Sequence, residues 1–173
     1  MFSFSDFMHT FLRGFLALAG GLLLTACDPA EVYEKNIDLT SPAGDPYVWA
    51  VQNKPTFEFD ITDPAPRYDV FLNVRNTADY SYYNLYARVT LTGPDGKIIS
   101  RKLHDMNLMD PKTGEPLGNG SGDIFDHRLL ALPNQEFSQP GTYRIQLEQY
   151  MRQDQLPGIM AVGVRVALHQ AGK

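Results

Sequence analysis

Apolar and polar side chains alternate one by one along five segments of this chain, at residues 57–62, 68–75, 82–91, 143–148 and 160–168. Because successive side chains of a strand point to opposite faces of a sheet, a period of two is typical of a strand with one buried face. No segment after residue 27 shows a sustained helical period. The alternation therefore predicts an all-β domain.

Three shorter segments, at residues 32–38, 97–104 and 127–132, are further strand candidates. Turn sequences separate the strands, such as Thr92–Lys97 (TGPDGK), in which Pro and Gly supply the backbone angles of a tight turn. About eight antiparallel strands in one domain predict a single antiparallel β-sandwich, of the jelly-roll or immunoglobulin-like type. Residues 133–137 (PNQEF) could form a short helix.

The stretch from Asp105 to Asp126 is rich in Gly and Pro and lacks the alternation. We expect a long loop there, crossing one end of the sandwich. Loops of this length are uncommon unless they are functional or disordered.

An apolar run from Phe11 to Leu24 precedes the only cysteine of the chain. The run is shorter than the ~20 apolar residues of a transmembrane helix and fits the apolar region of a secretory signal. The sequence Leu24-Thr25-Ala26-Cys27 is the lipobox pattern of bacterial lipoproteins. It predicts a cleaved lipoprotein signal peptide (1–26), a lipidated tether (27–32) starting at Cys27, and a β-sandwich domain (33–173). An uncleaved signal anchor and a free cysteine beside a simple signal are the alternatives.

The formal net charge of −5 restricts the partners of the chain. Binding to nucleic acid needs clustered Lys and Arg that neutralise phosphates, and a polybasic membrane patch needs the same. We therefore expect no nucleic-acid partner and a membrane contact made through the N-terminal lipid. With its single cysteine lipidated, the mature chain has no disulfide and no thiolate metal site.

The sequence contains no recognisable catalytic constellation. The glycines of residues 118–122 (GNGSG) lack the strand–helix context and the Lys-Ser/Thr of a phosphate-binding loop, and Ser121 lacks the flanks of a nucleophile elbow. A second set of candidates consists of aspartates that could gather around calcium and of histidines without metal-ligand spacing: Asp105, Asp110, Asp123, Asp126, His104, His127 and His169. Solvated turn aspartates and surface or packing histidines are the interpretation that we prefer. We predict a non-enzyme without a cofactor or a metal.

Trp49, the only tryptophan, lies in the segment DPYVWAV between turns marked by proline. It has two interpretations. In the first it closes one end of the hydrophobic core, and in the second its ring stacks on a sugar.

A turn at residues 77–81 would make the segments 68–75 and 82–91 neighbours in one sheet. If Val70, Leu72 and Val74 face the core, strand alternation directs the intervening side chains outward. The outward faces of both strands would then merge into one partner-binding patch, because aromatic residues and Arg are enriched at the centres of interfaces. Coverage of this face by a neighbouring segment is the alternative. The predicted patch consists of Phe71, Arg75, Tyr82, Tyr86 and Arg88.

The order of motifs resembles the gliding-motility lipoprotein GldH family of Bacteroidetes. The lipobox ending in CDP is followed by VYEKNIDL, FEFDITD, YDVFLNVRNTADYSYYNL, GPDG, DPKTGEPLGNGSGDI, GTYRIQLEQYMR and LPGIMAVGVRV. The resemblance covers nearly all of the mature chain. Family members often carry Trp at the position of Leu117 and an acidic residue near Ala161.

This resemblance implies an envelope lipoprotein of the gliding machinery and the type IX secretion system, with no known catalytic residues. Its expected place is the cell envelope, anchored by lipid to the outer membrane on the periplasmic face or the surface. The partners that it implies are other gliding or secretion proteins of the envelope. A lipid-anchored module that binds carbohydrate or another ligand is the alternative function.

Lipidation of Cys27 is testable by substitution. Cys27→Ser removes the thiol that accepts the diacylglycerol, and two or three acyl chains are what make such anchoring stable. We expect the variant to leave the detergent phase in a Triton X-114 partition, whereas the wild type stays in it. A variant that still partitions with lipid would contradict the anchor.

Overall fold

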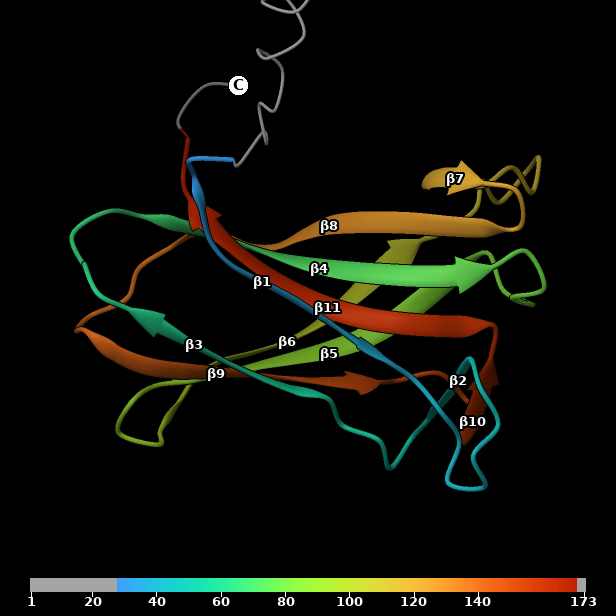
Figure 1. Cartoon of the computed structure of the whole chain (residues 1–173), viewed down its shortest axis with the longest axis horizontal. Helices are drawn as coiled ribbons and strands as arrows, with labels where there is room; N and C mark the ends of the chain where they lie inside the picture. The colour runs from blue at the N-terminus through green and yellow to red at the C-terminus, as the bar shows by residue number, and fades with distance from the viewer. Residues whose placement is uncertain (1–27, 171–173) are drawn as a thin grey trace, which may run out of the picture.

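The computed structural model describes residues 28–170, and within that range the chain forms eleven β-strands and no helix (Figure 1). The predicted signal peptide and Cys27 lie outside the described residues. Since every regular element in the described range is a strand, none of these residues forms a helix able to span a bilayer.

Two antiparallel sheets and a small ribbon make up the fold, and Figure 1 shows the two larger sheets as stacked layers. The five-stranded sheet has the order β1 (Glu31–Asp38), β11 (Ile159–Leu168), β4 (Tyr68–Thr77), β8 (Ile124–Gln135) and β7 (Asn119–Ser121). The four-stranded sheet has the order β3 (Thr56–Ile61), β9 (Gly141–Gln149), β5 (Asn84–Thr92) and β6 (Ile98–Asn107). The ribbon pairs β10 (Gln155–Pro157) with β2 (Val48–Ala50). The predicted all-β sandwich is confirmed.

Each of the eight predicted strands corresponds to a strand of the structure. The three that the sequence did not indicate, β2, β7 and β10, have three residues each. A segment of three residues is too short to show a period, so only the structure reveals these strands.

The alternation places the apolar side chains between the sheets. Along β4 every second side chain is buried, and β5, β9 and β3 contribute matching apolar rows from the other sheet. The two inward rows form one hydrophobic core, whose central members are Val70, Leu72, Val74, Leu85, Val89, Leu91, Ile145, Leu147, Val164 and Val166.

Aromatic rings fill the core at the end where β1 begins. Phe137 lies between Tyr143 and Tyr68, with ring centroids 4.6 and 5.2 Å apart in edge-to-face contacts. Phe59 packs against the same group at 5.9 Å from Phe137. Such pairs contribute roughly 0.5–1.5 kcal/mol beyond the area they bury.

Trp49 belongs to the core, in agreement with the first of its two interpretations. Its side chain is fully buried, and its indole N–H donates to the Asn53 carbonyl oxygen at 2.9 Å. Strand β2, which carries it, pairs with β10 so that Trp49 lies opposite Leu156. A ring in this position has no exposed face on which a sugar could stack.

Two expectations about irregular segments need correction. The predicted loop from Asp105 to Asp126 is shorter, because β6 extends to Asn107 and β7 begins at Asn119. The remaining residues do cross one end of the sandwich, since β6 and β7 belong to different sheets. Residues 133–137 contain no helix, because β8 continues to Gln135 in register with β4.

The structure also describes the last residues of the predicted tether. β1 begins at Glu31, inside the range that we expected the tether to occupy, so Asp28–Ala30 are the described residues before the first strand. The Leu168 amide donates to the Ala30 carbonyl oxygen at 2.8 Å, which joins this segment to the end of β11.

Truncation of Trp49 tests its place in the core. Trp49→Ala should lower the free energy of unfolding by about 3–5 kcal/mol, the usual cost of removing a large buried aromatic side chain. Urea denaturation followed by circular dichroism measures it. The control is Tyr47→Ala two residues away, where the side chain is exposed and the expected change is within about 0.5 kcal/mol. Equal losses in the two variants would contradict this role.

Candidate functional site

An open groove of about 640 Å³ lies on the outer side of the four-stranded sheet, at the end where β5 begins and β9 stops. We call it the tyrosine groove. Its wall is mainly aromatic and apolar, and Asn84, Arg152 and Gln153 add polar atoms at its margin. The side chains that define it are Tyr82, Tyr83, Tyr86, Leu103, Tyr150 and Met151.

Strand alternation in β5 sets the orientation of Tyr86. Leu85 and Ala87 are buried in the core, so Tyr86 between them points to the outer face. Backbone contacts hold the chain that follows β9 beside it: the Tyr150 amide donates to the Tyr86 carbonyl oxygen at 2.8 Å. The Tyr86 amide lies 3.3 Å from the Met151 sulfur. Residues from two distant segments therefore meet in one groove.

Arg88 is fixed next to the groove by two partners. Its Nε donates to a Glu148 carboxylate oxygen at 2.8 Å, and its guanidinium carbon lies 4.8 Å from the centre of the Tyr150 ring. Lys54 reaches the other Glu148 oxygen at 2.7 Å. The cation–π contact adds roughly 0.5–1 kcal/mol at a partly exposed site and orients the Tyr150 ring.

Ionisation in and around the groove follows from these contacts. The hydrogen bond from Arg88 outweighs burial and lowers the pKa of Glu148 to about 2. A hydrogen bond with Asp105 raises the pKa of the Tyr86 phenol. The groove is therefore bordered by phenol rings and by a compensated Arg–Glu pair, a composition suited to contacts that combine apolar area with hydrogen bonding.

The tyrosines of the groove differ in exposure. Tyr82 is partly buried against Tyr80, with ring centroids 5.7 Å apart, and Tyr80 lies in the core with its hydroxyl donating to the Asn84 carbonyl oxygen at 2.9 Å. Tyr83 is 50% exposed and Tyr150 is 53% exposed. Alternation with the buried Leu85 would direct Tyr83 inward, but Tyr83 is exposed because β5 begins at Asn84 and Tyr83 still belongs to the preceding loop.

The single partner-binding patch that the sequence predicted is not formed. β4 lies between β11 and β8 in the five-stranded sheet, whereas β5 lies between β9 and β6 in the four-stranded sheet. Phe71 and Arg75 on β4 therefore point away from the side that carries Tyr82, Tyr86 and Arg88. The error has a physical cause: residues 78–83 cross between the sheets and do not form a hairpin.

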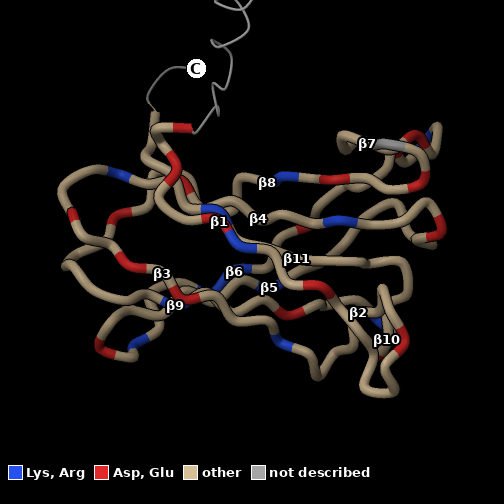
Figure 2. The backbone as a smooth tube through the Cα atoms, in the orientation of Figure 1, with Lys and Arg blue, Asp and Glu red and all other residues tan. Residues whose placement is uncertain are grey.

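Phe71 and Arg75 belong to the outer face of the five-stranded sheet. Arg75 makes two hydrogen bonds to the Asp126 carboxylate, at 2.8 and 3.0 Å, and Phe71 lies in register with Leu130. A polar groove of about 450 Å³ runs over this face beside Arg75. Its charged groups are largely paired with one another, for example Arg128 with Glu34 at 2.7 Å. Figure 2 shows acidic and basic positions interspersed in this way along the backbone.

Four of the aspartates and histidines that we considered as ligands lie in separate interactions, whereas the buried Nε2 of His104 has no hydrogen-bond partner. Asp126 pairs with Arg75, whereas Asp110 accepts hydrogen bonds from the amides of its own turn. His127 bonds Asn76 at 2.8 Å, and His169 lies 3.0 Å from Asp69. Within residues 28–170 no three His, Cys, Asp or Glu side chains gather in a way that could hold a metal ion.

Two glycines of the GNGSG segment, Gly118 and Gly120, have a packing role. A Cβ atom on Gly118 would lie 2.7 Å from the His127 ring, and one on Gly120 would lie 2.4 Å from the Phe125 ring. Because these positions carry no side chain, the backbone can approach β8 closely enough for β7 to pair with it.

Sequence reasoning found Tyr82 and Tyr86 of the tyrosine groove and Arg88 beside it, but it missed other members of the groove. Leu103 comes from β6, where it lies opposite Arg88, and Tyr150 and Met151 follow β9. The sequence did contain one signal for Tyr150 and Met151. They lie in the motif EQYMR, which is part of the family resemblance but had no role assigned to it.

Comparisons with known proteins agree on one family. The model of the GldH lipoprotein family matches residues 32–166. A gliding motility lipoprotein GldH homolog from Christiangramia forsetii is 32% identical over 152 residues, covering 84% of this chain and 88% of that protein. The gliding motility lipoprotein GldH of Flavobacterium johnsoniae is 27% identical over 150 residues, covering 86% and 87%.

Solved structures give weaker likenesses. The chain aligns with a VP2 subviral particle protein of infectious bursal disease virus at a TM-score of 0.38 and 18% identity, over 80% of this chain and 34% of that one. It aligns with PorU from Porphyromonas gingivalis at a TM-score of 0.34 and 14% identity, over 83% of this chain and 14% of that one. The chain thus spans about a third of the viral protein and a seventh of PorU.

The pH dependence of stability tests the Arg88–Glu148 contact. Because the pKa of Glu148 is about 2 in the folded chain and near 4.5 without its partners, the contact stabilises above pH 4.5. The contribution of the Arg88 and Lys54 contacts together, about 3 kcal/mol at roughly 1.36 kcal/mol per pKa unit, is lost as the pH falls towards 2. Glu148→Gln should therefore flatten the decline in unfolding free energy between pH 5 and pH 2, measured by urea denaturation.

The matched control for that measurement is Glu58→Gln. Glu58 lies on the same sheet and pairs with Arg144 at 2.6 Å, but both side chains are exposed. Exposed pairs contribute little, so this variant should keep the wild-type slope. Parallel curves for wild type and Glu148→Gln would show that the buried pair does not stabilise the fold.

Proposed function

The chain belongs to the GldH lipoprotein family, and from that premise we propose that it is a lipid-anchored, non-catalytic component of the gliding-motility and type IX secretion machinery. The observation that carries the proposal is the extent of the family match, which spans residues 32–166 and so includes both sheets. The names of the two relatives supply the gliding role. Non-catalytic action and the link to secretion are the finer parts of the proposal.

We propose further that the tyrosine groove is where this protein docks another protein of the envelope machinery. The groove combines exposed Tyr83, Tyr150 and Leu103 with the ordered guanidinium of Arg88. Tyr and Arg supply most of the binding energy at many interfaces, and they do so best where they are held rigid. Arg152 at the margin favours a partner segment that carries apolar and acidic side chains.

A second function is favoured by the same exposed rings. Two tyrosines bordering an open groove could stack on the sugar rings of a glycan, which would make this a carbohydrate-binding module. Titration with envelope or dietary polysaccharides separates the two functions, because saturable shifts in the tyrosine signals are expected only for glycan binding.

Complementation of a gene deletion tests the docking proposal. We expect the deletion to reduce surface spreading, or surface secretion in a host that does not glide, and the wild-type gene to restore it. Tyr83→Ala combined with Tyr150→Ala should restore it only in part, because each truncation of a binding hot spot costs on the order of 1–2 kcal/mol. Colony spreading and the secreted proteome are the measurements.

The matched control is Tyr47→Ala, which removes a tyrosine of similar exposure outside the groove. It should complement fully. Equal complementation by the control and the double variant would count against docking through the groove. A clean deletion with normal spreading and secretion would count against the motility function itself.

A further inference from the structure

Arg165 is a nearly buried cation in the otherwise apolar centre of β11. It is 5% exposed and lies on the outer face of the five-stranded sheet, in register with Glu34 on one side and Phe71 on the other. Its guanidinium contacts three carboxylates: Asp28 at 2.5 Å, Glu34 at 2.6 Å, and Glu31. All three come from β1 or from the residues just before it.

These contacts hold the start of the described chain in one place. One Asp28 oxygen bonds Arg165, and the other accepts from the Ala30 amide at 3.0 Å. The Asp28 carbonyl oxygen accepts from the Glu31 amide at 3.0 Å, and Ala30 is bonded to Leu168. Asp28 directly follows Cys27, and consecutive Cα atoms are only about 3.8 Å apart. The predicted lipid attachment is therefore next to a fixed residue.

We propose that Arg165 acts as a clamp that orients the sandwich on the membrane. The lipid surface then lies against the outer face of the five-stranded sheet at its Asp28 end, and the tyrosine groove faces away from the lipid. This inference rests on the lipid anchor of the proposed function. The partner recognised by this face is a phospholipid surface, and the partner of the groove must approach from the opposite side.

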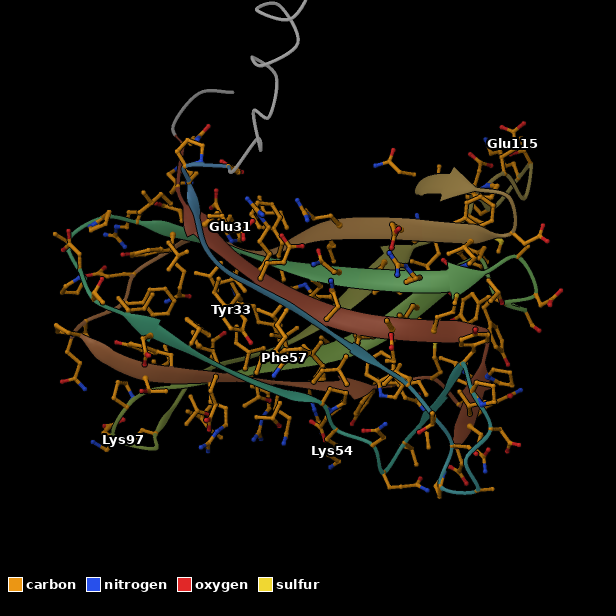
Figure 3. The ribbon with its side chains drawn as sticks, in the orientation of Figure 1. Glu31, Tyr33, Lys54, Phe57, Lys97 and Glu115 are labelled. Carbon is orange, nitrogen blue, oxygen red and sulfur yellow. The ribbon has the colours of Figure 1, made fainter. Side chains whose placement is uncertain are left out.

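The position of the groove follows from the sheet registers. Tyr68 is level with Leu168 at the clamped end, and β4 runs from there to Thr77, a distance of about 30 Å. Residues 78–83 then cross to the other sheet, about 10 Å away, where the groove begins. In Figure 3, Glu31 lies on the side of the five-stranded sheet, whereas Lys54 and Lys97 lie on the opposite side of the sandwich.

Attraction to lipid is not what would hold the outer face of the five-stranded sheet at the membrane. Its charges are paired internally, as in Arg75–Asp126 and Arg128–Glu34, so the face carries no basic patch that would bind anionic lipid by itself. Orientation therefore depends on the clamp and not on attraction between this face and the lipid.

Two exposed leucines on opposite faces provide a matched pair of probes. Leu130 lies on the five-stranded face in register with Phe71, and Leu103 lies on the four-stranded face; they are 44% and 52% exposed. With Cys27 lipidated, Leu130→Cys or Leu103→Cys introduces the only free thiol. Each variant is labelled with a fluorophore and placed in phosphatidylethanolamine–phosphatidylglycerol vesicles that contain a headgroup spin-labelled lipid.

We expect the label at Leu130→Cys to be quenched at least threefold more than the label at Leu103→Cys. Adding Arg165→Met should bring the ratio towards one, because the freed tether lets the domain tumble. Circular dichroism and a thermal melt check that this variant folds. Equal quenching at the two positions in the unaltered background, or stronger quenching at Leu103→Cys, would overturn the inference.

Two further measurements separate this inference from the proposed function. The intact mass of each purified protein reports whether acyl chains are attached, and their absence would contradict the lipid anchor. The rate of hydrogen exchange at the Ala30 and Glu31 amides, which both donate to Asp28, shows whether the clamp is formed. It can be measured whether or not lipid is attached. Slow exchange that becomes fast in Arg165→Met supports the clamp, and fast exchange in the wild type overturns it.

Discussion

The contact between the two inward sheet faces is the interaction on which the rest of the structure depends. The chain has a single cysteine, which is predicted to carry lipid, so no disulfide supports the mature domain. Burial of each large side chain in this contact contributes roughly 1.5–3 kcal/mol. Because consecutive strands β4 and β5 lie on opposite sides of it, the same contact also decides which side chains can share an outer surface.

The alternation predicted which side chains of a strand face the core, but not which strand lies next to it. That is why Val70 and Leu85 were placed correctly in the core while Phe71 and Tyr86 were wrongly placed on one surface. Tyr80 belongs to the connection between the two sheets: it is buried in the core, and its hydroxyl donates to the Asn84 carbonyl oxygen, while most of residues 78–83 stay at the surface. A tyrosine in a polar segment gives no such signal in the sequence.

The candidate site was found only in part for a related reason. Tyr86 and Arg88 follow from alternation within one strand, whereas Leu103 and Tyr150 reach the groove through pairing with β6 and through the backbone bond after β9. Pairing of distant strands depends on register, which local sequence does not fix. The buried Glu148 shows the same dependence, since only the meeting of β5 and β9 brings it to Arg88.

Arg165 raises the question of why a cation occupies the centre of an apolar strand. Removing the Arg165 guanidinium from water costs several kcal/mol although its partners Asp28 and Glu31 stay partly exposed, and an apolar side chain of similar volume is often as stable or more so. The free energy of unfolding therefore does not explain why Arg occupies position 165. An apolar residue could not bind the Asp28 and Glu31 carboxylates. Arg165 does, and it thereby fixes the direction in which the chain leaves the sheet. With the lipid on Cys27 as we propose, that direction determines which surface its partners can reach.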